Sequence, residues 1–499
     1  MTITILGFVT LIISIYAFFK NEKLLLYMVV FLSTFTAAEL GDIKATTTPI
    51  QTFEFTGAVW LLREFINFVK LRPKITKEII INKFKENNIA LAFVFFIISI
   101  ILGEITLVIS GISVEYIDVF GNQRMVKFGL SNITQSSILI FMFIIMIVLS
   151  FKIKTKEEVK ELLRVFCISA MFAVIWGLLQ FITYYFGIQY PAFLFNNNNY
   201  ALQGYNQIEN NIKRISSIAL EPSMFSITLI ALLAFLMGTF LKTNINLKNK
   251  KHLVLILGLL ATTICTILTT SSISYVGLVI VYGFFLVYIL FGFIKGGELS
   301  NRKHNFIKIL VSTVASIALA SMICIVFVKI GYKLGTIGEK TTIEEKNSEK
   351  ETENVIKKEE KYNKDIKAYD NMTTTLKQMT IQKLKTGSAL ERINGEKVGF
   401  SMLKYSPVFG IGFGSYRTYS LFTTVLVNAG IFGEITFLYI LFVVIREIMK
   451  LRNEEETMSI MLLVSIIGMT LGFFIRSSRL INNALLDYTC TWIQICKTE

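Results

Sequence analysis

Apolar residues run along this chain in uninterrupted stretches of about 20 residues. A stretch of this length matches the roughly 30 Å hydrocarbon core that a membrane-spanning helix must cross. The stretches stay apolar throughout, whereas the strands of a membrane barrel alternate in polarity, so the pattern predicts helices. The expected spans are residues 1–19, 24–40, 51–69, 88–110, 135–151, 165–187, 218–240, 253–270, 275–294, 308–330, 419–445, 458–475 and 481–496. The predicted fold class is an all-α polytopic membrane protein with 12 or 13 transmembrane helices, the last span being short and interrupted by Asp487.

The connections between these spans alternate in charge. One set comprises residues 20–23, 70–85, 152–164, 242–251, 295–308 and 446–452. This set holds 24 Lys and Arg, whereas the short connections of the opposite set hold seven. Positive connections stay in the cytoplasm, so the first set is predicted to be cytoplasmic and the N-terminus external.

The external connections divide the chain into three regions. Residues 1–330 hold helices 1–10, with external loops at 111–134 and 188–217. Residues 331–418 form a large external loop, and residues 419–499 hold helices 11–13. The alternating charges of residues 344–370 predict a solvated helical hairpin, for which a water-facing flap without chemistry is the plain reading. Residues 372–404 become amphipathic, which is typical of a helix lying on the outer membrane surface.

Composition excludes several classes of protein. The chain of 499 residues is 53% apolar, which excludes a soluble enzyme. In a polytopic membrane protein, the net charge of +15 reflects cytoplasmic loops rather than nucleic-acid binding. The five cysteines all lie in apolar stretches, so neither a disulfide framework nor a zinc site is expected.

An acidic residue opens the span at 218–240. Glu221 precedes Pro222, a residue suited to the first helical turn, so Glu221 is expected at a helix N-terminus that favours its carboxylate. Arg214 lies within loop reach of it. The pair is either a structural cap with an ion pair or a site where Glu221 accepts a hydroxyl proton while Arg214 holds an anionic group.

A second cluster precedes the span at 419–445. Gly410, Gly412 and Gly414 alternate with apolar residues, and the cations Arg392, Lys404 and Arg417 flank them. Backbone N–H groups of such a loop converge on anions, which predicts a phosphate or pyrophosphate site. The alternative is a tight re-entrant turn into the bilayer.

Further external residues suggest an electropositive chamber that also binds sugar. Arg124, Arg476 and Arg479 are expected to face the same side as Arg214, with snorkelling to lipid headgroups as the alternative. An aromatic and amide-rich stretch suits sugar rings, although aromatics at this level also anchor proteins in the membrane. Its candidate sugar-binding residues are Tyr190, Asn198, Tyr200 and Tyr205.

Taken in order, these motifs resemble the O-antigen polymerase/ligase superfamily of bacterial envelope glycosyltransferases. The resemblance rests on Arg214 with Glu221-Pro222-Ser223, the Thr269–Ser272 turn, Glu391-Arg392 with the glycine run, and Val427–Gly433. It implies a fold like that of the C-type glycosyltransferases, with no cofactor and no metal. Many relatives carry an acidic residue at the position of Asn428 and an arginine near Ser271, so neither position is given a role here.

The resemblance also implies a reaction and its partners. The expected substrate is an undecaprenyl-pyrophosphate-linked oligosaccharide in the bacterial plasma membrane, with the site facing the periplasm or cell exterior. Arg214 and Arg392 would stabilise the leaving pyrophosphate, Glu221 would be the base, and membrane lipids and optionally a chain-length regulator would be partners. Ligases of this superfamily depend on a histidine in the large loop, which residues 331–418 lack, so a polymerase is favoured. A flippase or another transporter is the alternative from a different class.

Overall fold

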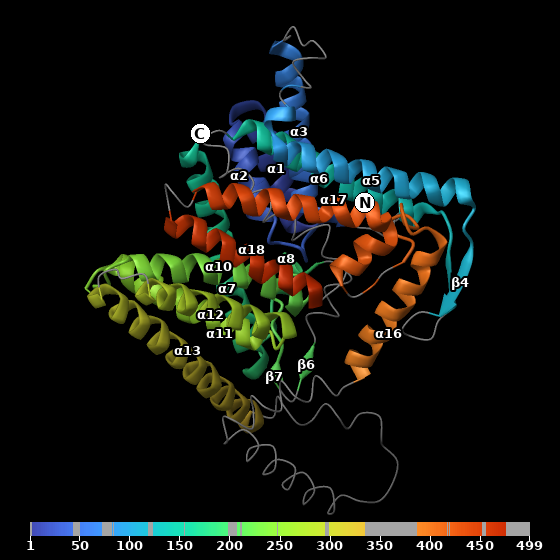
Figure 1. The fold of residues 1–499 in the computed structure, drawn as a ribbon. Helices are drawn as coiled ribbons and strands as arrows, with labels where there is room; N and C mark the ends of the chain where they lie inside the picture. The colour runs from blue at the N-terminus through green and yellow to red at the C-terminus, as the bar shows by residue number, and fades with distance from the viewer. Residues whose placement is uncertain are drawn as a thin grey trace, which may run out of the picture.

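The computed structural model describes most of the chain, and Figure 1 shows that it is mostly helical. The described residues are 2–42, 50–71, 82, 84–117, 123–153, 155–197, 207–209, 212–246, 248–294, 299–334, 387–416, 418, 420–451 and 456–475. The expected hairpin at 344–370 and the expected span at 481–496 lie outside these residues.

The described residues form fourteen α-helices. They are α1 (Ile5–Lys20), α2 (Glu22–Leu32), α3 (Thr52–Leu71), α5 (Asn88–Ser110), α6 (Leu130–Lys152), α7 (Lys156–Tyr185), α8 (Ala192–Phe195), α10 (Pro222–Lys242), α11 (Lys250–Leu268), α12 (Ser272–Ile294), α13 (Leu299–Lys333), α16 (Gly387–Met402), α17 (Leu421–Leu451) and α18 (Glu456–Ile475). A 3₁₀ turn, η1 (Leu403–Tyr405), follows α16. Among the described residues, α5, α6, α7, α10, α11, α12, α13 and α17 are long and apolar enough to cross a membrane. This confirms a helical, multi-pass membrane protein.

In the described part of the chain, short antiparallel strands precede the first helix or connect helices. β1 (Thr2–Ile3), β2 (Glu39–Asp42) and β3 (Ile50–Gln51) form one sheet. β4 (Val114–Ile117) pairs with β5 (Gln123–Val126), and β6 (Ile208–Glu209) pairs with β7 (Ile212–Lys213). All three pairings lie in the N-terminal segment or in connections predicted to be external.

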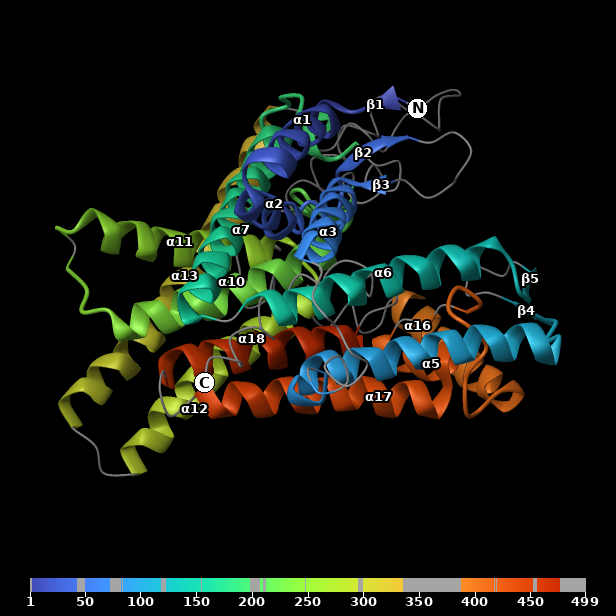
Figure 2. The ribbon, with the colours of Figure 1, turned by 90° about the horizontal axis from the view of Figure 1, so that it is seen from above.

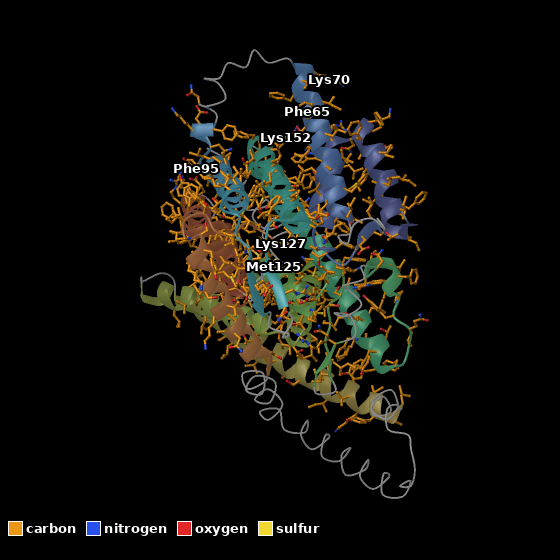
Figure 3. The ribbon with its side chains drawn as sticks, turned by 90° about the vertical axis from the view of Figure 1, so that its right-hand side faces the viewer. Phe65, Lys70, Phe95, Met125, Lys127 and Lys152 are labelled. Atoms are coloured by element: carbon orange, nitrogen blue, oxygen red, sulfur yellow. The ribbon has the colours of Figure 1, made fainter. Side chains whose placement is uncertain are left out.

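Contacts between connections agree with the predicted alternation. Lys152 forms ion pairs with Glu22 and Glu64, which joins three connections or helix ends assigned to the cytoplasm. Two connections of the opposite set, 111–134 and 331–418, contact each other through the Asn132 amide, which donates to Phe413 O at 2.9 Å. In Figure 3, Lys152 and Lys70 lie toward the top, away from Lys127 on the β4–β5 connection. The assignment of these two ends to the two sides of a membrane rests on the charge pattern.

Helix α10 lies at the centre of the bundle. Nearly all of its residues are buried, and it packs against α7, α11, α12 and α18. Figures 1 and 2 both show α5, α6 and α17 side by side, with β4 and β5 at one end of α5 and α6. Because α10 has 21 residues and a rise of about 1.5 Å per residue, it is about 31 Å long and reaches across a hydrocarbon core.

The expected span at 24–40 is wrong as a continuous helix. Its helix α2 has 11 residues, or about 16 Å of length, which is too short to cross the membrane. The chain continues from Ser33 without helix until β2, which pairs with β1 beside the start of α1. This segment leaves the helical path because Ala37 N–H donates to Ile218 O at 3.0 Å, a contact with a distant part of the chain.

Helix α17 is broken at Gly430, whose φ of 69° and ψ of −171° are not helical. Residues 431–451 beyond the break extend for about 31 Å, which is enough to cross the membrane without the first part of α17. The break therefore lies near one boundary of the hydrocarbon core, on the side of α16 and the β4–β5 hairpin.

Candidate functional site

Four segments with little helix meet inside the bundle at the start of α10. We call residues 33–40, 190–197, 214–221 and 268–271 the irregular core. Hydrogen bonds that join these segments run from Ala37 N to Ile218 O (3.0 Å), from Asn196 Nδ2 to Ser217 O (2.6 Å) and from Ile215 N to Leu268 O (3.3 Å). At membrane depth, non-helical backbone is tolerated only where protein or a cavity surrounds it, and such places are frequently functional.

Helix α7 supports the irregular core along its length. The Gln180 Oε1 atom accepts hydrogen bonds from the N–H groups of Ser216 (3.0 Å) and Ser217 (2.8 Å). The Ser217 hydroxyl donates to Ala173 O at 2.5 Å, two turns further along the helix. Residues 214–221 therefore dip into the bundle beside α7 instead of lying above it.

Arg214 is half-buried and is attached to the end of α11. Its Nε atom donates to Thr269 O at 3.2 Å, and its backbone N–H donates to Gln207 O at 3.1 Å. The C-terminal carbonyls of a helix attract cations, so Thr269 at the end of α11 gives the guanidinium a natural anchor.

Glu221 is the N-cap residue of α10, as the sequence predicts, with Pro222 at the first helical position. Its carbonyl accepts the N–H groups of Met224 (3.0 Å) and Phe225 (3.2 Å), while the Ser223 hydroxyl lies 3.5 Å from Oε2. The side chain of Glu221 is half-buried. Its carboxylate lies at the positive end of the helix dipole.

A cluster of three hydroxyls fixes the start of α10 to the turn that holds Arg214. The Ser226 hydroxyl donates to Pro222 O at 2.7 Å, and its oxygen lies 3.2 Å from Thr269 Oγ1. Ser274 completes the cluster through hydrogen bonds with Ser226 (2.5 Å) and Thr269. Because Thr269 contacts both Arg214 and Ser226, the fold links Arg214 to the N-terminal part of the helix that Glu221 caps.

Two residues of this region have a left-handed backbone without being glycine. Ser217 has a φ of 54° and Thr270 a φ of 48°. For a β-branched residue such as Thr270, this conformation is strained. Strain of this kind is maintained only where the surrounding contacts fix it, and it clusters at functional sites.

The glycine loop does not form the expected phosphate cradle. Gly410 N–H donates to Ser406 O and Gly412 N–H donates to Asn428 O, both at 2.9 Å. Ile431 N–H in turn donates to Pro407 O at 2.9 Å, across the break in α17. These N–H groups are used within the protein, so the expectation that they bind pyrophosphate is wrong for Gly410 and Gly412, and the re-entrant turn is the better description.

The glycines serve close packing instead. Gly410, Gly412 and Gly414 all have positive φ values, between 77° and 88°. A Cβ atom on Gly410 would lie 2.3 Å from the Asn428 carbonyl carbon, and one on Gly414 would lie 2.6 Å from Ser131 O. One carboxylate reaches this loop, but it is the chain's own Glu104, held by the Ser136 hydroxyl.

Of the remaining predicted anion-binding residues, the structure describes the side chains of Arg124 and Lys404. Arg124 is exposed on β5, opposite Tyr116, whose ring packs on Tyr416 near the glycine loop. Lys404 is exposed, with its Nζ 4.9 Å from the Tyr405 ring centroid. Arg392 belongs to α16, but its side chain is not described. Arg417, Arg476 and Arg479 lie outside the described residues.

The predicted sugar-binding tyrosine is inside the protein. Tyr190 is 5% exposed, and its hydroxyl lies 3.1 Å from Asn196 Oδ1, so the ring supports the 190–197 segment and offers no open face. This corrects the expectation of an exposed stacking surface at Tyr190. Asn198, Tyr200 and Tyr205 lie outside the described residues.

Comparison with family models, with curated proteins and with solved structures gives no match for this chain. A function must therefore be argued from the residues themselves. Among the described residues, no group of three or more His, Cys, Asp and Glu is arranged to hold a metal ion.

Sequence reasoning did not assign roles to three polar residues that support the irregular core: Gln180 on α7, and Asn196 and Thr269 within the core. Gln180 lies within an apolar span, and a polar residue at that depth is a signal for function or for buried backbone partners. Asn196 and Thr269 were part of recognised motifs, but their roles depend on Ser217 and Arg214, which are distant in sequence.

Proposed function

We propose that this protein is a polysaccharide polymerase of the bacterial plasma membrane. It transfers a growing glycan from undecaprenyl pyrophosphate to the sugar of another lipid-linked repeat unit, on the outer face of the membrane. The observation that carries the proposal is the link, made by Thr269 and Ser226, between Arg214 and the N-terminal part of the central helix that Glu221 caps. The resemblance to the O-antigen polymerase/ligase superfamily supplies the substrate class.

The two side chains fit the two charge changes of such a transfer. As the acceptor oxygen forms a bond to the anomeric carbon of the growing glycan, the bond from that carbon to the pyrophosphate oxygen breaks. Glu221 takes the proton of the acceptor hydroxyl, which requires a carboxylate, the form that the helix N-terminus favours. Arg214 stabilises the negative charge that develops on the leaving pyrophosphate.

The experiment is a profile of lipid-linked glycans in cells that lack the protein. Cells complemented with wild type are expected to regain long polymer, whereas Glu221→Gln or Arg214→Ala leaves single repeat units on their lipid. Glu115→Gln, which changes an exposed carboxylate on β4, is the matched control and restores polymer. Full polymer in the Glu221→Gln cells contradicts the assignment of the base.

A transporter of lipid-linked oligosaccharide is the second candidate. Two interrupted segments favour it, since α2 ends at Leu32 and α17 breaks at Gly430, and discontinuous helices are typical of transporter binding sites. The same cells separate the two functions. Repeat units that stay on the cytoplasmic face indicate a transporter, and repeat units exposed outside without polymer indicate a polymerase.

A further inference from the structure

Trp176, on α7, and Asn197, in the irregular core, each have a buried side-chain N–H group without a hydrogen-bond acceptor. Among the described residues, three buried side-chain nitrogens lack a partner: Trp60 Nε1, Trp176 Nε1 and Asn197 Nδ2. Trp60 belongs to α3, whereas the ring of Trp176 on α7 packs against Phe195, two residues before Asn197. We call Tyr190, Phe195, Trp176 and Asn197 the Trp176 cluster. Buried N–H groups are almost always paired, so the two unpaired N–H groups of this cluster call for an explanation.

The cluster holds aromatic rings beside the amide. The ring centroid of Trp176 lies 4.8 Å from that of Phe195 and 5.8 Å from that of Tyr190. Asn197 follows Phe195 by two residues, and its Oδ1 accepts the N–H of Glu39 at 2.8 Å. That bond fixes the amide, so Nδ2 is oriented while it lacks an acceptor.

The chemistry of the cluster selects a class of ligand. The two unpaired donors are neutral N–H groups, whereas strong phosphate contacts are typically made by Arg or Lys, so an anionic phosphate is disfavoured here. A hydrocarbon chain offers no acceptor for either N–H group. A sugar offers hydroxyl oxygens that accept hydrogen bonds from neutral N–H groups.

We propose that Trp176 and Asn197 form a subsite for a sugar ring of the lipid-linked glycan. The neighbouring Asn196 donates from Nδ2 to Ser217 O, which links this part of the chain to the segment that ends at Glu221. Both orphan nitrogens are closed to solvent, so binding of a glycan requires a local rearrangement of the side chains around them. The inference rests on the proposed function for the identity of the glycan.

Tryptophan fluorescence tests this subsite directly. The chain has three tryptophans, Trp60, Trp176 and Trp492, so the full-length Trp60→Phe/Trp492→Phe protein reports on Trp176 alone. The probe is a set of oligosaccharides released by mild acid from the surface polysaccharide of the source cell. We expect a saturable change in emission with these oligosaccharides and none with undecaprenyl pyrophosphate. Adding Asn197→Asp, which keeps the acceptor for Glu39 and removes the donors, is expected to weaken binding about fivefold.

A kinetic comparison provides a matched control. Trp176→Phe keeps a ring and removes one orphan N–H group, and Trp60→Phe makes the same change in α3. We expect Trp176→Phe to raise KM for the lipid-linked repeat unit about fivefold with kcat nearly unchanged, and Trp60→Phe to change neither. Equal effects of the two variants would overturn the subsite.

The two proposals fail separately. No emission change with the oligosaccharides overturns the sugar subsite, whatever reaction the protein catalyses. A saturable change in a protein whose loss leaves polymer length unaltered supports the subsite and contradicts the polymerase.

Discussion

The irregular core and the glycine loop are both non-helical regions, but they satisfy their backbones differently. The glycine loop, residues 406–416, uses glycines wherever φ is positive and pairs its N–H groups with carbonyls across the break in α17. The irregular core instead holds Ser217 and Thr270 in left-handed conformations and adds Arg214 and Glu221. Glycine adopts positive φ without steric cost, whereas the other residues do not. The loop therefore meets its backbone geometry through glycine and close packing, and the irregular core is the region to which we assign the proposed chemistry.

The largest effect is expected from Gly410→Ala in the glycine loop. The new methyl group would lie 2.3 Å from the Asn428 carbonyl carbon at a φ of 77°, so backbone must shift, at a cost of about 4 kcal/mol. Thermal unfolding in detergent, or failure of the protein to accumulate, measures this. Gly283→Ala in α12 is the control, because nothing lies within 4 Å of its Cβ, and it should be about 0.5 kcal/mol more stable. A Gly410→Ala protein as stable as wild type would show that the loop is not tightly packed.

Substitution of one arginine in each region compares how much the two regions contribute to the transfer rate. Arg214→Ala in the irregular core is expected to lower the transfer rate more than 100-fold, or by about 3 kcal/mol in the barrier, because it removes charge stabilisation of the leaving group. Arg124→Ala, an exposed residue beside the glycine loop, is expected to change the rate less than threefold. Both are measured as polymer formed per unit of protein in membranes. The comparison fails if Arg124→Ala has the larger effect.

Asn132→Ala tests the attachment of the glycine loop to α6. It removes the hydrogen bonds that Asn132 donates to Phe413 O (2.9 Å) and Ser415 Oγ (2.7 Å), and the Phe413 carbonyl loses its side-chain donor, so stability falls by about 2 kcal/mol. The folded fraction should retain its specific activity. Gln135→Ala, an exposed change on the same helix, should alter stability by less than about 0.5 kcal/mol. A loss of specific activity larger than the loss of folded protein would give the loop a chemical role.

Thr270→Gly has the smallest expected effect and the opposite sign. Glycine relieves the strain at a φ of 48° but adds freedom to the unfolded chain, so the protein should become about 0.5 kcal/mol more stable. Activity should fall a few-fold, because the turn that carries Thr269 O and Arg214 loosens. Paired measurements of unfolding and polymer formation check this. Higher activity together with higher stability would show that the strain has no function.

The sequence predicted the helices well where hydrophobicity alone decides. The span at 88–110 coincides with α5, and Glu221-Pro222 begins α10 as the capping pattern predicts. The span at 24–40 failed as a helix because residues 33–40 bind the backbone of residues 218–220, which a local pattern does not contain. The prediction that Tyr190 exposes its ring to a sugar is wrong for the same reason, since Tyr190 is buried against Asn196 and Trp176.

Hydrophobic length and capping act over neighbouring residues, so the sequence predicts the membrane character of the chain, several of its spans and the helix start at Glu221. Which polar groups are already paired depends on the tertiary structure. The sequence predicts that the Gly412 N–H group is available to an anion, but in the structure it donates to Asn428 O. Arg214 donates to Thr269 O, which is 55 residues away in the sequence. Inside a membrane each buried N–H group needs a partner, and the partner is chosen by three-dimensional packing.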